Sequence, residues 1–448
     1  MSEVVKIKKG LDIKMVGKAE HTLQVSKSSD LFAIKPTDFH NLTPKLLVRV
    51  DDEVKVGTAL FQDKYRPEIK FTSPVSGKVV AVNRGERRRI LEVVIESDGK
   101  HDVLEFKKGS AATLSADEIK ENLLGMGLWP FIKQRPYGII ANPESKPKAI
   151  FISGFDSAPL APDYAFILKD QLSSFQAGID LLAKMSGAPV HVSLPAGQDS
   201  PLKQVKNAKL HTFAGPHPAG NVGIQIHHIA PINKGETVWT VGPQEVAMIG
   251  RSLENGHLIA EKIVALAGSE VIKPQYYKTT LGTSIKEIVA ANIKEGNVRY
   301  ISGNVLTGTK ISKSNFLGFY DSLLSVIPEG DYYELFGWAL PGFGKFSTSR
   351  TFFSWLTPNK EYRLDTNYHG GERAFVMSGE YNKVVPMEVM PVQLLKAILA
   401  EDIDAMEQLG IYEVIEEDFA LCEFVCTSKI DSQEIIRNGL NLMIKELS

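Results

Sequence analysis

Between residues 47 and 95, short runs of Val, Ile and Leu alternate with polar residues. Such alternation is typical of β-strands that bury one face. Gly57 and Gly77 separate these runs, at points where tight turns must connect neighbouring strands. The pattern predicts a small all-β sandwich, to which we assign residues 29–105.

Residues 106–257 show the order of helices and strands that is typical of an α/β layer. Ser115, followed by Glu118, forms a capping-box pattern at the start of the helix predicted in SADEIKENLLGMGLWP. Further on, a strand is predicted in KAIFISGF, a helix in QLSSFQAGIDLLAKMSG and a second strand in PVHVSL. Gly187 is expected to end the helix. Two strands joined through a helix are expected to be parallel. We expect residues 1–28 to pack with this α/β domain.

A second change of pattern occurs near residue 258. The stretches KIVALAG and VRYISG predict strands on either side of a short helix, residues 284–293. Ser284 and Glu287 give that helix a capping box, and its apolar residues form one stripe. A compact β-grasp domain is therefore predicted for residues 258–330.

The rest of the chain divides into an aromatic and a helical part. Residues 331–378 form an aromatic-rich connecting region, which is either a surface for a hydrophobic partner or an isoprenoid headgroup, or a small aromatic core. Residues 379–448 form a helical domain. One helix is predicted from Pro391 to a stop at Gly410, and a final helix begins near Asp431. The fold class is thus multidomain, combining α/β and α+β parts.

Composition and charge narrow the possible functions. A chain of 448 residues has room for three or four domains, and its net charge of −2 gives no electrostatic attraction to nucleic acid. The sequence contains no apolar run of about 20 residues and no apolar segment of signal-peptide length at its N-terminus. We expect a cytoplasmic protein, or one attached to the cytoplasmic face of a membrane.

Patterns that bind dinucleotides or flavins are incomplete in this chain. Gly125-Met-Gly127 and Gly342-Phe-Gly344 lack a third glycine and follow no clear strand. A covalent flavin needs a threonine in a short Gly-Ala-Thr sequence, but Pro189 stands at that place in one candidate stretch. No cofactor is predicted for this chain.

The histidines and cysteines do not predict a metal site. His227 and His228 are adjacent, and on a strand their side chains would point to opposite faces. Cys422 and Cys426 would share one face of a helix, but two thiols supply only half of the ligands of an iron–sulfur cluster. We interpret them as core residues, since free cysteine is often buried.

Residues 47–95 resemble a biotinyl/lipoyl carrier domain that lacks its attachment sequence. In such carriers a lysine at an exposed hairpin tip bears the cofactor, and the corresponding tip here reads Gln62-Asp-Lys-Tyr-Arg-Pro67. Lys64 is thus either an attachment site or a solvated turn residue, and we predict that it is unmodified.

Six stretches make the chain resemble the NqrA family, the A subunits of the bacterial Na+-translocating NADH:quinone oxidoreductase. They are KGLDIKMVGKA, FTSPVSGKVVAVNRGERR, LWPFIKQRPYG, FAGPHPAGNVGIQIHHIAPI, FGWALPGFGKFS and EDFALCEFVC, in the order of the family. That family is similar to the flavin and iron–sulfur subunits of complex I and of the Rnf complex. The similarity implies a Rossmann-like character for the α/β domain and an SLBB-like character for the β-grasp domain.

The resemblance also implies a role. It indicates a peripheral subunit on the cytoplasmic face of the bacterial inner membrane, which contacts the membrane through partners, chiefly the membrane-embedded B subunit. The complex oxidises NADH, reduces ubiquinone or another quinone, and exports Na+, using FAD, FMN, riboflavin and a 2Fe-2S cluster on other subunits. Quinone contacts are expected in LWPFIKQRPYG, from Trp129 and Phe131 to the ring or tail and from Lys133 or Arg135 to a carbonyl oxygen.

Two functions of other classes compete with this one. The first is a biotin- or lipoate-carrying subunit of a decarboxylase-type pump, with the cofactor on Lys64. The second is a ligand-binding or envelope-export module built on the β-grasp domain.

Overall fold

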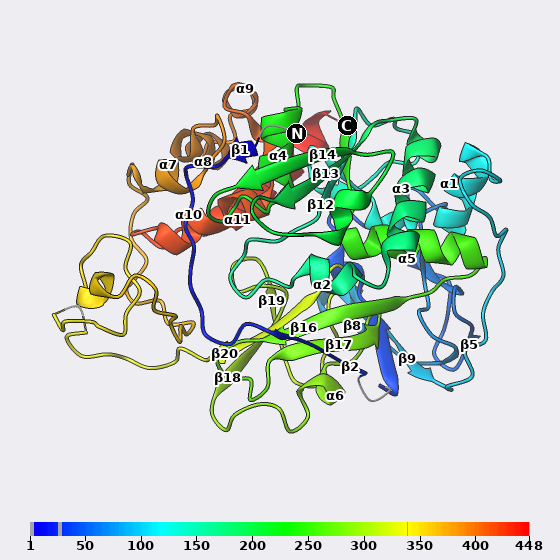
Figure 1. Cartoon of the computed structure of the whole chain (residues 1–448), viewed down its shortest axis with the longest axis horizontal. Coiled ribbons are helices and arrows are strands. Elements are labelled where there is room, and N and C mark those ends of the chain that lie inside the picture. Colours follow the sequence, from blue (N-terminus) through cyan, green and yellow to red (C-terminus); the bar gives the residue numbers. More distant parts are fainter. Residues whose placement is uncertain (1–3, 26–28, 338, 448) are drawn as a thin grey trace.

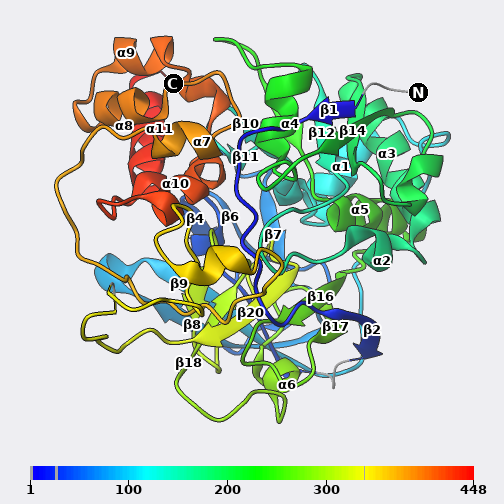
Figure 2. The same ribbon diagram turned by 60° about the vertical axis from the view of Figure 1, so that its left-hand side comes forward.

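A computed structural model describes residues 4–25, 29–337 and 339–447. Residues 1–3 and 26–28 of the predicted N-terminal segment, and Trp338 of the aromatic region, lie outside the described residues. Within the described part of the chain the strands form four sheets, and the C-terminal helices pack beside the largest of them (Figures 1 and 2).

Two small antiparallel sheets form the predicted β sandwich. Gly77 adopts a φ of +150°, and a Cβ atom there would lie 1.9 Å from the carbonyl oxygen of Glu96, so a side chain does not fit at this turn. Lys64 lies exposed in the turn between β6 (Ala59–Asp63) and β7 (Lys70–Thr72). The strands, in sheet order, are β3 (Leu31–Ile34), β9 (Ile90–Ser97), β8 (Gly77–Arg84) and β5 (Glu53–Val54), and then β4 (Pro44–Leu46), β6 (Ala59–Asp63) and β7 (Lys70–Thr72).

The largest sheet of the described residues is mainly parallel. The predicted parallel pairing of β12 (Ile150–Ser153) with β13 (Val190–Pro195) is confirmed. Helices α1, α3 and α5 cover one face of the sheet, and α4 covers the other. The strands, in order, are β1 (Val4–Lys6), β14 (Lys209–Ala214), β13 (Val190–Pro195), β12 (Ile150–Ser153), β15 (Val238–Thr240), β10 (Lys133–Arg135) and β11 (Ile139–Ile140). The helices are α1 (Ala116–Gly125), α2 (Tyr164–Leu168), α3 (Leu172–Ser186), α4 (Val222–Ile229) and α5 (Pro243–Asn255).

The helix starts and stops predicted for this part of the chain are confirmed. Ser115 accepts a hydrogen bond from the backbone of Glu118, and the Glu118 carboxylate accepts one from the backbone of Ser115. Gly187 ends α3 with a φ of +66°. Alternate residues of β12 face opposite sides, because Ile150 packs in the core under α3 and α5 while Phe151 packs under α4.

The predicted β-grasp region forms a mixed sheet, but its helix is shorter than predicted. The sheet order is β19 (Thr309–Ile311), β18 (Val298–Ser302), β20 (Leu323–Pro328), β16 (Glu261–Ala267), β17 (Gln275–Thr280) and β2 (Glu20–Val25). Helix α6 spans Lys286–Val289 and has no side-chain cap. Ala291 has a φ of +52° and Ile293 pairs with Val271, so pairing of the backbone replaces the last turns of the expected helix.

The predicted helix from Pro391 to Gly410 is also interrupted. Glu401 adopts a φ of +55°, and the Asp402 carboxylate accepts a hydrogen bond from the backbone of Ala405, which starts a new helix. Leu399, the last helical residue before this break, is 58% exposed. The C-terminal helices are α7 (Glu380–Val384), α8 (Pro391–Leu399), α9 (Ile403–Gln408), α10 (Ala420–Val425) and α11 (Ser432–Leu447). None of the helices in the described residues has the length and apolar composition needed to cross a bilayer.

The N-terminal segment joins two sheets. Its first strand, β1, pairs with β14 in the α/β sheet, and its second strand, β2, pairs with β17 in the mixed sheet. Between the two strands, a Cβ atom on Gly17 would lie 2.3 Å from the carbonyl oxygen of Gly268. The segment therefore packs against the α/β sheet at one end and the mixed sheet at the other.

The order of the parallel strands creates a crevice. The chain leaves β12 towards β13 and β14 on one side and then crosses to β15 on the other side of β12. At such a reversal, the connections after neighbouring strands diverge and open a space outside their carboxyl ends, where α/β proteins commonly bind ligands. In this structure that space lies at the ends of β12 and β15.

Candidate functional site

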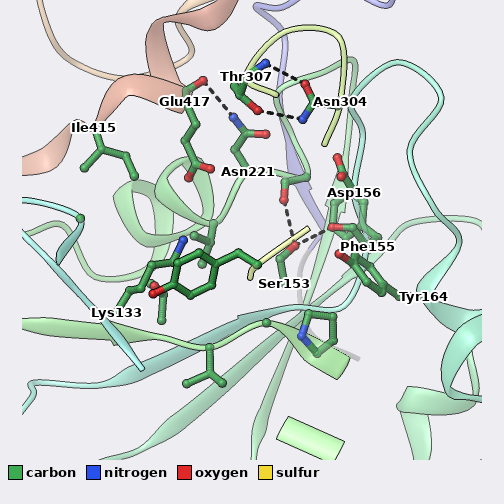
Figure 3. Close-up of a pocket in the computed structure, with 18 of the residues that line it drawn as sticks. Lys133, Ser153, Phe155, Asp156, Tyr164, Asn221, Asn304, Thr307, Ile415 and Glu417 are labelled. Carbon is green, nitrogen blue, oxygen red and sulfur yellow. Dashed lines mark hydrogen bonds between the residues drawn. The ribbon is translucent and has the colours of Figure 1, made fainter. Parts of the chain in front are cut away.

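A cavity of about 250 Å³ lies outside the carboxyl ends of β12 and β15. Figure 3 shows Lys133, Ile415 and Glu417 on one side of it, and Phe155, Asp156 and Tyr164 on the other. The walls come from the α/β domain, from the mixed-sheet region (Asn304, Thr307 and Tyr320) and from the C-terminal helical region. Parts of the chain that are distant in sequence thus close one polar space.

Ser153, the last residue of β12, joins the two loops that border the cavity. Its hydroxyl oxygen lies 2.7 Å from the carbonyl oxygen of Phe155 and 2.9 Å from that of Gly220, and it accepts a 2.7 Å hydrogen bond from the Gln225 amide. These bonds connect the loop after β12 to the start of α4. The wall of the cavity is therefore held by part-buried hydrogen bonds.

His217 is held as a neutral imidazole at the cavity wall. The Ser157 hydroxyl accepts a hydrogen bond from the backbone of Gly220 at 2.8 Å and lies 3.0 Å from His217 Nδ1. This arrangement leaves the Ser157 proton to be donated to Nδ1. Burial lowers the pKa of His217 to about 4, so the ring carries no charge at neutral pH.

The opposite wall carries acidic and phenolic groups. Burial raises the pKa of Asp156 to about 6, although its carboxylate accepts backbone hydrogen bonds from Ala158 and Ser157 that act in the other direction. Burial also raises the pKa of Tyr164 and Tyr320, so both phenols are protonated. The cavity therefore offers hydroxyl groups as well as one carboxyl group that titrates near neutral pH.

Lys133 supplies the cavity with a positive charge. Its ammonium group lies 4.5 Å from the centre of the Tyr320 ring, an attractive cation–π geometry. The Tyr320 hydroxyl donates a 2.8 Å hydrogen bond to the carbonyl oxygen of Pro130, which fixes the ring. No carboxylate of the described residues forms an ion pair with Lys133 within 4.0 Å. This cation is consequently available to a ligand.

Arg135 lines the same cavity but is already neutralised. Its side chain is 2% exposed, and its two terminal nitrogens lie 2.7 Å from Asp418 Oδ2 and 2.5 Å from Glu417 Oε1. Burial lowers the pKa of Arg135, but the charges of Asp418 and Glu417 raise it by more, so the guanidinium stays charged. A Cβ atom on Gly223 would come within 2.4 Å of Nη1, so glycine leaves the space that the guanidinium fills. This ion pair connects β10 to the C-terminal helical region.

Trp129 and Phe131, the other two residues proposed for quinone, lie in the core behind this wall. The Trp129 indole donates a 2.8 Å hydrogen bond to the carbonyl oxygen of Ala141. Phe131 stacks on Phe319 with 4.3 Å between ring centres. Neither side chain lines the cavity. The quinone contact expected of them remains a prediction, and the structure brings together Lys133 and Arg135.

The assumption that His227 and His228 lie on a strand is wrong. Both belong to α4, because the apolar residues before them repeat with a helical period and pack under the sheet. His227 Nδ1 lies 2.7 Å from Glu413 Oε2, and its Nε2 accepts a hydrogen bond from the backbone of Glu388. His228 donates from Nδ1 to the carbonyl oxygen of Ile224. Both histidines hold structure together.

The two cysteines are buried beside Tyr381, whose hydroxyl donates a 2.9 Å hydrogen bond to Cys426 Sγ. Burial raises the pKa of Cys422, which disfavours the thiolate that a metal or cluster requires. In the described ranges, no group of three or more His, Cys, Asp or Glu side chains is placed to hold a metal ion. The donor set at these thiols does not fit an iron–sulfur cluster.

Several residues of the cavity were missed by sequence analysis. Asp156 could have been found, because it directly follows a predicted strand at the edge where ligands bind in α/β sheets. Tyr320, Asn304 and Glu417 had no such signal, since they reach the cavity from other regions of the fold.

His217→Asn is expected to change the pH dependence of stability. In the wild-type chain the unfolded state binds a proton near pH 6.5, while burial keeps the folded imidazole neutral down to about pH 4, so stability falls as the pH drops through this window. The difference amounts to roughly 2 kcal/mol at pH 5. Urea unfolding at pH 7 and pH 5 should therefore show a smaller loss for His217→Asn than for wild type, with His257→Asn as control. An equal loss in both proteins would contradict a neutral, buried His217.

Family models and relatives identify the group to which the chain is similar. Three family models match parts of the chain. Residues 5–98 match the NqrA N-terminal barrel-sandwich hybrid domain, residues 114–258 match the NqrA second alpha/beta domain, and residues 263–313 match the NQRA C-terminal domain. The fold is accordingly a barrel-sandwich domain, an α/β domain, an SLBB domain and C-terminal helices.

Relatives match over almost the entire chain. The A subunit of the Na(+)-translocating NADH-quinone reductase of Yersinia pestis bv. Antiqua (strain Angola) is 40% identical over 99% of this chain and 100% of that protein. The protein of the same name from Neisseria meningitidis serogroup A is 37% identical over the same shares. Among solved structures, an NAD+-reducing NiFe hydrogenase in its H2-reduced state has a TM-score of 0.40 at 13% identity, covering 74% of this chain and 61% of that one. That value is too low to support an argument, but the full-length identities show that this chain belongs to the NqrA family, the A subunits of the Na(+)-translocating NADH-quinone reductase.

Proposed function

We propose that this chain is the peripheral A subunit of a reductase that passes electrons from NADH to a quinone and exports Na+. Similarity to relatives of that name along their whole length supports this role. In this proposal the chain lies on the cytoplasmic face of the inner membrane and is held there by membrane subunits, chiefly the B subunit. The segments 1–28, 29–105, 106–257, 258–330, 331–378 and 379–448 are its proposed structural units.

The redox groups of the assembly are proposed to lie on other subunits. FAD, FMN, riboflavin and a 2Fe-2S cluster supply the electron-transfer chemistry there. The donor set of this chain favours that division, because Cys422 and Cys426 are buried in a packed core and Tyr381 donates to one of them. This chain contributes binding and positioning.

The cavity at the ends of β12 and β15 is our candidate for quinone contact. The single observation that carries this assignment is the Lys133 ammonium group, which faces a polar space and has no carboxylate partner among the described residues. Its N–H groups can donate to a quinone carbonyl oxygen, and the developing negative charge on a reduced quinone would strengthen that bond. The cavity volume of about 250 Å³ suits one substituted ring.

The other three proposed residues would act by positioning the cavity wall. Arg135 holds Glu417 at the cavity wall through its ion pair. Trp129 and Phe131 flank Pro130 in one short helical turn, and the carbonyl oxygen of Pro130 accepts the hydrogen bond from Tyr320. They would therefore position Lys133 and the Tyr320 ring for the ligand.

Lys133→Met tests this site. Loss of a charge-assisted hydrogen bond costs about 1.5–3 kcal/mol. In the assembled reductase, the KM for quinone should therefore rise roughly 10- to 100-fold. NADH oxidation by an artificial electron acceptor should continue at the wild-type rate. Lys64→Met, at an exposed turn outside the cavity, is the control. An unchanged KM for quinone in Lys133→Met would refute the assignment.

A carrier function is the alternative; the full-length similarity to reductase subunits does not favour it, although Lys64 is exposed at a hairpin tip. Asp63 makes this tip rigid, because its carboxylate accepts hydrogen bonds from the backbone of Tyr65 and from the side chain of Arg66. We expect the intact mass of the chain, purified from cells that contain biotin and lipoate ligases, to equal the unmodified mass. A mass increase that maps to Lys64 and equals one biotinyl or lipoyl group would favour the carrier.

A further inference from the structure

Residues 335–356 expose an unusual number of large apolar side chains; we call this stretch the apolar loop. In Figure 1 it lies at the edge of the molecule, beside α10 and away from the sheets. Seven of its described large apolar residues have exposed fractions between 49% and 83%, and these are Leu335, Phe336, Leu340, Phe343, Phe353, Trp355 and Leu356. A monomer that works alone rarely leaves such a group in water.

The base of the loop is firmly attached to the body. The backbone of Tyr362 pairs with residues on either side of Met15, and its ring is buried. Arg363 forms a 2.8 Å ion pair with Glu270, and the Thr366 hydroxyl donates a 3.0 Å hydrogen bond to Glu329. The apolar loop is therefore presented on a fixed base at one place on the surface.

The area involved fits a protein interface. Phe, Tyr and Trp side chains bury about 150–250 Å² each. The seven residues, of which three are leucines, are half to four-fifths exposed and together offer on the order of 700 Å². This exceeds the patch of a few hundred Å² that is ordinary for a monomer. It approaches the ~800 Å² that each partner buries in a stable complex.

Charge indicates what kind of surface would cover the loop. From residue 335 to residue 360 the sequence has no Asp or Glu, while it has Lys345, Arg350 and Lys360. Lys345 pairs with Glu334 at the edge of this stretch, and Arg350 lies 5.9 Å from the centre of the Trp355 ring. Aromatic residues with interleaved arginine are typical of interface cores. A complementary surface would be apolar and carry carboxylates.

The backbone of the loop distinguishes a protein partner from lipid. Apart from one short turn at Phe353–Leu356, its described residues lie in no helix or strand. Irregular backbone does not enter the hydrocarbon of a bilayer, because its N–H and C=O groups would lose their hydrogen bonds. A protein surface can pair with those groups while it covers the side chains.

We propose that the apolar loop docks this chain onto an apolar, carboxylate-bearing surface of a partner protein in the same reductase. This inference rests on the proposed function and names the part of the chain that makes the assembly. It also assigns a role to the aromatic-rich region that the quinone cavity does not use.

The triple variant Phe343→Ser, Trp355→Ser and Leu356→Ser tests the proposal. The complex is purified through a tag on one of the membrane proteins, and the amount of this chain that remains is measured. At least a tenfold loss is expected, with an unchanged thermal midpoint of the isolated chain, since these side chains are exposed. Tyr65→Ser with Leu91→Ser, exposed apolar residues elsewhere, is the matched control and should leave retention unchanged.

Each other result has a defined meaning. Full retention of the triple variant would overturn the proposal. If the triple variant were fully retained but the isolated variant no longer bound phosphatidylglycerol vesicles that the wild-type chain binds, the loop would bind lipid and not protein. If the wild-type chain did not co-purify with the membrane proteins of the complex, the proposed function itself would fail. Arg350→Glu should weaken retention, whereas Arg49→Glu should not.

Discussion

The buried ion pair between Arg135 and Asp418 is the interaction on which the arrangement of the site depends. It joins the antiparallel edge of the α/β sheet to the C-terminal helical region, and Glu417 beside it forms part of the cavity wall. Burial raises the pKa of Asp418 to about 6, and the Arg135 charge opposes that rise, so the carboxylate is ionised at pH 7. Removing one partner of such a pair leaves a buried charge and costs about 3–5 kcal/mol.

This constraint explains how the chain keeps a polar cavity at the strand ends without the glycine-rich loop of a nucleotide-binding enzyme. The strand order opens a crevice at β12 and β15, and two other regions of the chain contribute to its walls. What remains is a small polar cavity with one cation that has no carboxylate partner among the described residues. A space of that kind could hold and polarise a single ring, as the proposed function requires.

Local patterns predicted much of the fold, and contacts between distant residues account for the rest. The start of α1 at Ser115 and Glu118, the end of α3 at Gly187 and the parallel pairing of β12 with β13 were predictable. In each case the responsible residues are close in sequence. The break between α8 and α9 carried a signal in Asp402 that could have been recognised. Lys133 and Arg135 were selected by resemblance, but the partner of Arg135 is 283 positions away, so its neutralisation was invisible in the sequence.

The central claim is that the Arg135 ion pair holds the helical region against the α/β domain and thereby closes the cavity. Hydrogen–deuterium exchange of Arg135→Met tests it most directly, with Arg66→Met, which removes an ion pair at the hairpin tip, as control. The account predicts faster exchange in residues 411–425 and 215–222 and unchanged exchange in the strands of residues 261–280. Exchange in residues 411–425 that matches wild type would contradict it.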